Sequence, residues 1–144
     1  MVTCCDTSFL FALYGSDSMS VRAVKFAMNF DEAVFLSRLN LFEYENALRL
    51  AEFRKLISAG QRLEYFSLFH EALSAGRLAF EDTNLADVLA EAGRISEAHT
   101  PGGGHRGFDI LHVAAAKKIG ATDFLTFDQN QRKLARAVGL NVPL

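Results

Sequence analysis

Short apolar runs alternate with longer amphipathic segments along the whole chain. Short runs that are bounded by polar or turn-forming residues are typical of buried β-strands. They predict strands at Val2–Cys5, Ala33–Ser37, Arg77–Glu81 and Thr122–Phe127, with Leu140–Val142 as a candidate for a last strand. The amphipathic segments predict helices at Thr7–Tyr14, Ser20–Phe30, Arg38–Ser58, Arg62–Ala75, Asn84–Ala98, Phe108–Ile119 and Gln129–Val138.

The alternation of strands with helices predicts an α/β fold. Parallel strands joined by helices are covered on both faces, so we expect a parallel sheet flanked by helices in a three-layer α/β/α arrangement. The length of 144 residues fits one domain over residues 1–144. The one clear loop is His99–His105, which contains three consecutive glycines.

Composition narrows the class of protein. Half of the residues are hydrophobic and 13 are Phe, which is enough for a core. Cys4 and Cys5 are adjacent in a predicted strand, so we expect reduced side chains that point to opposite faces. No apolar run is long enough to span a bilayer and the N-terminus lacks a signal-peptide pattern, so a cytoplasmic protein is expected. The net charge of −2 argues against a strong general nucleic-acid binder.

Two acidic residues stand where strands end and helices begin. Asp6 follows the strand at Val2–Cys5, and Asp128 follows the strand at Thr122–Phe127. Ligands of open α/β sheets bind outside the carboxyl ends of the strands, so both side chains are in the right place for a site. Aspartate is also a favoured N-cap, which is the structural explanation for each residue taken singly.

A third acid, Glu43, lies within a predicted helix. At about 100° per residue, Glu43 shares a helical face with Leu39, Ala47, Leu50 and Ile57. Its neighbour Glu45 points to the far side, where Arg49 follows at the spacing of a solvated ion pair. Glu43 is therefore expected to face inward and Glu45 to face solvent. A place at the edge of the apolar stripe, or a pairing with Arg106, is the alternative for Glu43.

A fourth acid, Asp109, lies in the first turn of a helix that also carries His112. The helix dipole favours an acid at that position, which is the structural alternative. His112 is expected to be a buried supporting residue and no more. Asp82 follows the third strand and is the most credible spare acid, whereas Asp123 begins its strand and faces the opposite edge of the sheet.

Four carboxylates brought together repel one another, so a bound divalent cation is the natural compensation. A site made only of oxygen ligands favours Mg²⁺ or Mn²⁺ over zinc. We therefore expect a metal-dependent hydrolase in which Asp6, Asp109 and Asp128 bind the metal and Glu43 either joins them or positions the attacking water. The glycine run at Gly102–Gly104 lacks the spacing of a nucleotide-binding loop, and the chain has neither a GxSxG nor an HExxH motif.

Four stretches, taken together, resemble the PIN-domain family and especially the toxin ribonucleases of the VapC type. They run in the family's order and span nearly the whole chain. The stretches are Cys5–Leu10, Leu39–Leu48, Phe108–Ala116 and Phe124–Asp128. The resemblance implies a Mg²⁺- or Mn²⁺-dependent endoribonuclease that hydrolyses RNA, with Asp6, Glu43, Asp109 and Asp128 as its catalytic acids. It also implies supporting roles for Ser8 and Thr126.

The resemblance carries expectations about partners as well. Toxins of this type are neutralised by a small antitoxin protein and often form homodimers. An apolar groove between the predicted helices Ser20–Phe30 and Arg38–Ser58 is the expected antitoxin site. The family also contains processing nucleases, so an RNA-processing nuclease and an inactive RNA- or protein-binding module are the alternatives.

Two unrelated classes fit less well. A phosphotransferase of the haloacid-dehalogenase type needs a second Asp where Ser8 stands. A receiver-type signalling domain needs a lysine at the end of a later strand, whereas Lys117 and Lys118 lie near the end of a predicted helix.

Overall fold

The computed structural model describes residues 1–144. Its four strands and seven helices alternate much as the hydrophobic pattern predicts. In chain order they are β1 (Thr3–Cys5), α1 (Thr7–Tyr14), α2 (Ser20–Ala27), β2 (Val34–Leu36), α3 (Arg38–Phe53), α4 (Ala59–Ser74), β3 (Leu78–Phe80), α5 (Leu85–Gly103), α6 (Gly107–Ile119), β4 (Asp123–Leu125) and α7 (Gln129–Ala137).

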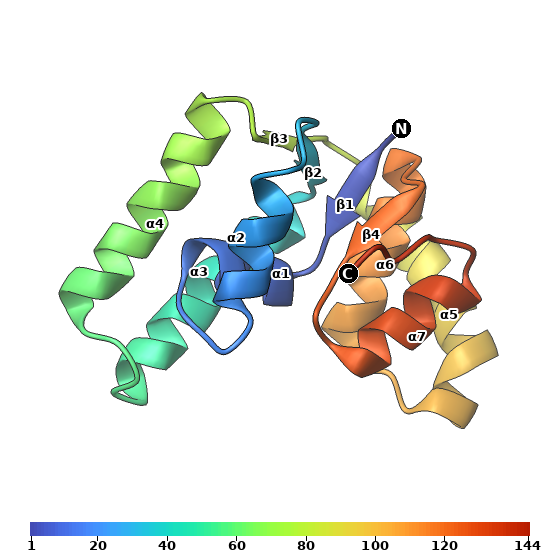
Figure 1. Cartoon of the computed structure of the whole chain (residues 1–144). Helices are drawn as coiled ribbons and strands as arrows, with labels where there is room; N and C mark the ends of the chain where they lie inside the picture. Colours follow the sequence, from blue (N-terminus) through green and yellow to red (C-terminus); the bar gives the residue numbers. More distant parts are fainter.

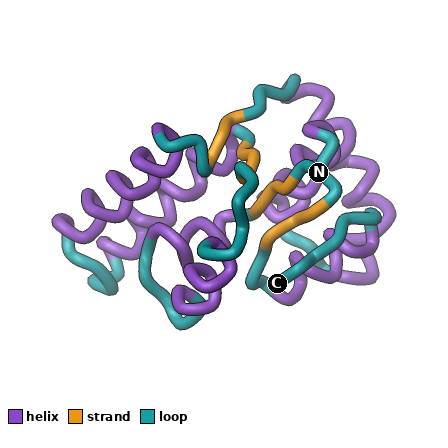
Figure 2. The backbone as a smooth tube through the Cα atoms, turned by 45° about the horizontal axis from the view of Figure 1, so that its top comes forward, coloured by secondary structure: helices purple, strands orange, loops and turns teal.

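The four strands form one parallel sheet in the order β3-β2-β1-β4. Strand β1 is central, and Cys4 is paired with Phe35 of β2 on one side and with Phe124 of β4 on the other. Helices α5, α6 and α7 lie on one side of the sheet, and the α3–α4 pair extends away from them on the other (Figure 1). The strands run through the middle of the molecule with helices on both sides (Figure 2), which confirms the predicted three-layer α/β/α fold.

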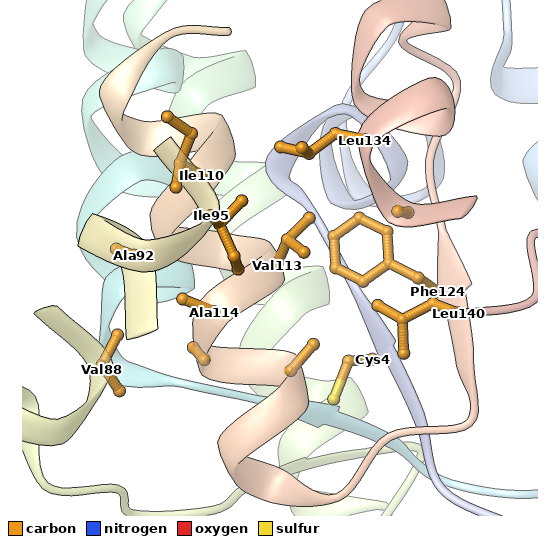
Figure 3. Close-up of a cluster of buried hydrophobic side chains, with 13 residues drawn as sticks. Cys4, Val88, Ala92, Ile95, Ile110, Val113, Ala114, Phe124, Leu134 and Leu140 are labelled. Atoms are coloured by element: carbon orange, nitrogen blue, oxygen red, sulfur yellow. The ribbon is translucent and has the colours of Figure 1, made fainter. Parts of the chain in front are cut away.

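The side chains of β1 divide between two hydrophobic cores, one on each face of the sheet. Cys4 packs in the core beneath α5, α6 and α7, where Figure 3 shows Val113 of α6 between Ile95 of α5 and Phe124 of β4. Full burial of a side chain the size of Phe124 contributes roughly 1.5–3 kcal/mol. Cys5 packs in the opposite core. Both cysteines are free and buried, as expected from neighbouring positions in a strand.

The second core is built around aromatic rings from α1, α3 and α4. Tyr44 and Phe69 are fully buried, and their rings stack with centroids 4.9 Å apart. The Tyr44 hydroxyl donates a hydrogen bond of 2.8 Å to the carbonyl of Tyr14, which satisfies its polar end. Because desolvation disfavours the phenolate, burial raises the pKa of Tyr44. This core fixes α3 against α1 and so sets the position of the acid that α3 carries.

Three predicted elements differ from the structure. The segment predicted as the loop His99–His105 is helical as far as Gly103, because α5 continues through Pro101. Proline removes only its own hydrogen bond in the last turn, and the helix ends where Gly104 takes the left-handed conformation, with φ of 66°. At the C-terminus the predicted strand Leu140–Val142 is reduced to a single bridge between Asp123 and Asn141.

The third difference is the boundary between α3 and α4. Helix α3 ends at Phe53, short of the predicted Ser58, and Lys55 follows in a left-handed turn with φ of 58°. Ser58 is instead the N-cap of α4 and accepts a hydrogen bond from the backbone of Gln61. A serine followed three residues later by glutamine is the signature of a capping box, and that pattern explains the early start of α4. None of the helices is long and apolar enough to cross a membrane.

Candidate functional site

The four predicted acids line one pocket at the carboxyl ends of β1 and β4. Because these strands are adjacent and parallel, the residues that follow them, Asp6 and Asp128, meet at the same edge of the sheet. Helix α3 brings Glu43 to this edge, and α6 brings Asp109. The pocket has a volume of about 280 Å³, and its lining comprises Asp6, Thr7, Ser8, Phe11, Asp17, Glu43, Ala47, Arg106, Asp109, His112 and Asp128.

Asp6 is the most deeply buried of the four acids, with 4% of its surface exposed. Its donors are all neutral: Ser8 Oγ at 2.7 Å, Thr126 Oγ1 at 2.6 Å and the backbone nitrogen of Phe9 at 3.2 Å. Burial raises the pKa of Asp6, and these hydrogen bonds offset that effect only in part. A buried carboxylate that only neutral groups contact is a charge that a cation would stabilise.

Ser8 and Thr126, the two predicted supporting residues, join Asp6 to the end of β4. Their hydroxyl oxygens lie 3.3 Å apart, one bonded to each oxygen of the Asp6 carboxylate. The backbone nitrogen of Phe127 donates to Ser8 Oγ at 3.0 Å, and that of Asp128 donates to Thr126 Oγ1 at 3.1 Å. The two hydroxyl groups therefore hold the beginning of α1 and the beginning of α7 in one arrangement.

Glu43 faces the pocket from the edge of the buried stripe of α3. That stripe consists of Asn40, Tyr44, Leu48 and Ala51, and Leu50 is exposed. The sequence predicts a buried face of this helix centred on Glu43 and including Leu50. The face that the structure buries is rotated about 100° around the helix axis from the predicted one. Glu43 and Glu45 are both half-buried, with side chains 32% and 25% exposed. The predicted ion pair of Glu45 with Arg49 is present at 2.8 Å, but the prediction that only Glu45 faces solvent is wrong.

The Glu43 carboxylate is held by two side chains from other helices. Thr7 Oγ1 donates to Glu43 Oε2 at 2.8 Å, and His112 Nε2 contacts the same oxygen. Burial alone would raise the pKa of Glu43, but the His112 and Thr7 hydrogen bonds, with the nearby Arg106 charge, hold that pKa below its usual range. Glu43 therefore stays ionised at neutral pH.

Asp109 and Asp128 have a free oxygen each beside their structural contacts. Asp109 Oδ2 is paired with Arg106 Nε at 3.2 Å, and this ion pair takes the place of the alternative pairing of Arg106 with Glu43. Asp128 is the N-cap of α7 and its Oδ1 accepts from the backbone of Gln131 at 2.7 Å. Asp6 is likewise the N-cap of α1. The capping explanation is thus correct for both residues, and it leaves one Asp128 oxygen available.

The other acids considered from the sequence lie outside the pocket. Asp82 is exposed and paired with Arg38 at 3.2 Å. It follows β3, and two strands separate β3 from β4, so Asp82 lies away from the pocket. Asp123 binds Asn141 through a side-chain hydrogen bond of 3.0 Å at the opposite edge of the sheet. The spare-acid role considered for Asp82 is therefore not supported by its position.

Sequence reasoning missed three residues around the site. Thr7 contacts Glu43, Asn40 lies beside His112, and Asp17 adds a fifth acid to the lining of the pocket. Thr7 directly follows the first acid, and that position is the only local signal that could have drawn attention to it. Asn40 reads as an ordinary polar residue of α3, and its burial appears only in the folded chain.

The donor set is chemically suited to a hard divalent cation. It consists of carboxylate oxygens, which are the ligands that Mg²⁺ and Mn²⁺ prefer, and Asp6 is a buried charge that only neutral groups compensate. As the side chains stand, however, no three His, Cys, Asp or Glu side chains converge on one metal position. Asp109 Oδ2 is instead paired with Arg106.

Comparison with known protein families decides the class of this fold. The model of the PIN domain matches residues 3–137, which is most of the chain. The chain belongs to the PIN domain family. The matched residues include all four predicted acids of the pocket. A comparison with curated protein sequences finds no match.

Solved structures support the fold of this PIN domain. A VapC20 toxin of Mycobacterium tuberculosis, which cleaves the sarcin-ricin loop, has 20% identity and a TM-score of 0.69, with 97% of this chain and 98% of that chain covered. VapBC2 of Rickettsia felis, bound to a promoter DNA fragment, has 18% identity and a TM-score of 0.66, with 99% and 97% covered. FitAcB of Neisseria gonorrhoeae has 20% identity and a TM-score of 0.63, with 98% and 96% covered. At such identities the likeness concerns the fold.

Proposed function

We propose that this PIN domain is a metal-dependent endoribonuclease, which hydrolyses phosphodiester bonds of RNA, and that it is the toxin of a toxin–antitoxin pair. One observation carries the proposal. The acids of all four family-like stretches, Asp6, Glu43, Asp109 and Asp128, line a single pocket although they are far apart in sequence. Helix capping accounts for the presence of Asp6 and of Asp128 at their positions. It does not account for the fact that all four acids line the same pocket.

The proposed cofactor is Mg²⁺ or Mn²⁺, since PIN nucleases generally use divalent metal ions. Asp6, Asp109 and Asp128 would hold the ion. When bound, it would stabilise the negative charge that develops on the phosphate during hydrolysis. Asp109 Oδ2 is paired with Arg106, so Asp109 would offer Oδ1 to the ion while that pair is kept.

The chain's own residues would bind and orient the RNA phosphate and the water. Arg106 is the one Arg or Lys in the lining, and its side chain is 79% exposed, so it is free to contact a phosphate once Asp109 releases it. Glu43 either completes the metal ligands or accepts a hydrogen bond from the attacking water. Ser8 and Thr126 keep Asp6 in place through the bonds described above.

The toxin assignment rests on different support. VapBC2 and FitAcB have the same fold over nearly their whole length, and helix α2 presents an exposed apolar surface on this chain. Val21 on that helix is 81% exposed, and Met28, directly after its last residue, is 78% exposed. Apolar side chains that a monomer leaves in water are typical of a surface that a partner covers. We propose that a protein antitoxin binds there and that the free toxin is a homodimer.

The test of activity is RNA cleavage by the purified, antitoxin-free protein. Cleavage is expected with Mg²⁺ or Mn²⁺ and should stop with EDTA. Asp6→Asn, Asp109→Asn and Asp128→Asn should each abolish cleavage while the circular-dichroism spectrum stays native. Asp82→Asn is the matched control, because Asp82 is exposed and lies outside the pocket. A folded wild type that cuts no RNA with either metal would refute the assignment.

The test of the toxin assignment is co-expression with the product of the neighbouring gene. A stable complex without cleavage activity is expected. Light scattering after size-exclusion chromatography would measure the mass of the free protein and so test the dimer. Recovery of only free, active enzyme would favour an RNA-processing nuclease.

A further inference from the structure

The two oxygens of the Glu43 carboxylate have different surroundings. Oε2 accepts from Thr7 Oγ1 at 2.8 Å and contacts His112 Nε2, and these partners belong to different helices, α1 and α6. Oε1 accepts no hydrogen bond from the protein. Because Oε2 is anchored from two directions, the carboxylate cannot rotate without breaking one of these contacts. Oε1 is therefore the only oxygen that Glu43 can offer to anything that enters the pocket.

A buried amide fixes the orientation of the His112 ring. The backbone nitrogen of Ser37 donates to Asn40 Oδ1 at 2.9 Å, and since a backbone N–H can only donate, the amide oxygen must face Ser37. The amide nitrogen then faces the other way. It donates to the carbonyl of Cys5 at 3.0 Å and lies 3.5 Å from His112 Nδ1. Both Asn40 and His112 are buried, so water does not replace these contacts.

The amide therefore selects the tautomer of the imidazole. An N–H group of Asn40 that faces Nδ1 requires a lone pair there, which leaves the ring proton on Nε2. The Nε2–H group points at Glu43 and donates to Oε2. The result is a directed chain of contacts that runs from Ser37 through Asn40 and His112 to Glu43.

We propose that Asn40, His112 and Thr7 are positioning residues that bind Glu43 Oε2 and leave Oε1 to orient the attacking water. This inference rests on the proposed ribonuclease activity and chooses between the two roles open to Glu43. A carboxylate that is anchored through one oxygen cannot chelate a metal ion through both. Its free oxygen has a fixed lone-pair direction, which is what the orientation of a water molecule requires. In this proposal Asp6, Asp109 and Asp128 bind the metal, and the Mn²⁺ titration described below distinguishes it from binding of the metal through Oε1 alone.

The first test uses matched variants of the two donors. His112→Leu removes the donor, His112→Gln places an N–H group near the former Nε2, and His112→Asn reaches only as far as the former Nδ1. Thr7→Val removes the hydroxyl at constant shape, and Thr7→Ser keeps it. The Leu, Asn and Val variants should lower kcat by up to about 100-fold, whereas Gln and Ser should restore most of it. A purely structural role would not separate His112→Gln from His112→Asn in this way.

The second test measures the metal directly, by calorimetric titration of Mn²⁺ into the same variants without RNA. The affinity should stay at the wild-type value, because the proposal leaves Glu43 out of the ligand set. If His112→Leu and Thr7→Val weaken Mn²⁺ binding and excess metal restores their kcat, Glu43 is a ligand and the proposed role is wrong. Should His112→Leu fail to fold, Thr7→Val alone decides the question.

The third test needs neither metal nor activity. In ¹⁵N spectra of the metal-free protein, the resonances lost in His112→Gln identify the ring, and its proton should be on Nε2. A proton on Nδ1 alone would overturn the Asn40 argument. The outcomes also separate this inference from the proposed function. Absence of cleavage in the wild type refutes the ribonuclease, whereas wild-type kcat in both His112→Leu and Thr7→Val, with Asp109→Asn inactive, refutes only the positioning role.

Discussion

Glu43→Gln paired with Glu45→Gln is the most informative substitution in this chain, because both residues lie on α3 and only one faces the pocket. In Glu43→Gln the amide oxygen can still accept from Thr7 and His112, so the fold should be kept. The amide nitrogen must then replace Oε1, which turns an acceptor in the pocket into a donor. Glu45→Gln changes an ion pair with Arg49 and nothing in the pocket.

The expected magnitudes differ widely. Loss of a positioned carboxylate typically costs about 10²–10⁴ in rate, which corresponds to about 3–5 kcal/mol of activation free energy. The Glu45–Arg49 pair, at 2.8 Å and i,i+4 spacing, is worth about 0.3–0.5 kcal/mol. For a chain of this size that is about 1–2 °C in Tm. Cleavage by Glu45→Gln should stay near the wild-type rate.

The assay is cleavage of a fluorescent RNA under single-turnover conditions, with Mg²⁺ varied and Tm recorded for each variant. The reasoning fails if Glu43→Gln keeps more than half of the wild-type rate. It fails equally if Glu45→Gln is the inactive variant, because the orientation of α3 would then be wrong. A lowered rate in Glu43→Gln with a collapsed Tm would point to misfolding, and Thr7→Val would replace it as the test.

Three further predictions concern stability and the partner. Asp6→Asn keeps an N-cap acceptor and removes a desolvated charge, so it should raise Tm in EDTA at pH 7. Because burial raises the pKa of Asp6 in the folded state, this gain in Tm should vanish below about pH 4 and grow as pH rises. A gain in Tm that grows toward low pH would contradict the prediction. Asp128→Ala should cost about 1 kcal/mol by loss of the bond from the Gln131 backbone, whereas Asp128→Asn should keep that bond, so equal Tm values for the two variants would refute the capping role. Val21→Glu together with Met28→Glu should prevent capture of a co-expressed antitoxin and leave RNA cleavage unchanged, and a pull-down that still recovers the complex would exclude this surface.

The sequence by itself determined the α/β class, the parallel sheet and the positions of Asp6 and Asp128. These follow from local patterns, since the apolar period identifies each strand and the order strand–acid–helix repeats at both sites. Parallel strands end at the same edge, so two acids that follow strands had to face the same side. The opposite directions of Cys4 and Cys5 have an equally local cause in the two-residue period of a strand.

Tertiary structure decided how the acids are held. The order of the strands removed Asp82 from the site, because it placed β3 at the edge of the sheet. The contacts of Glu43 join residues 36 and 69 positions away, Thr7 and His112. No local periodicity encodes such a pairing, since it depends on how α1, α3 and α6 pack around the cores. The role of Asn40 could not be predicted from the sequence for the same reason. Its amide has one fixed orientation only because packing buries it and because the backbone N–H of Ser37, which can only donate, binds its oxygen.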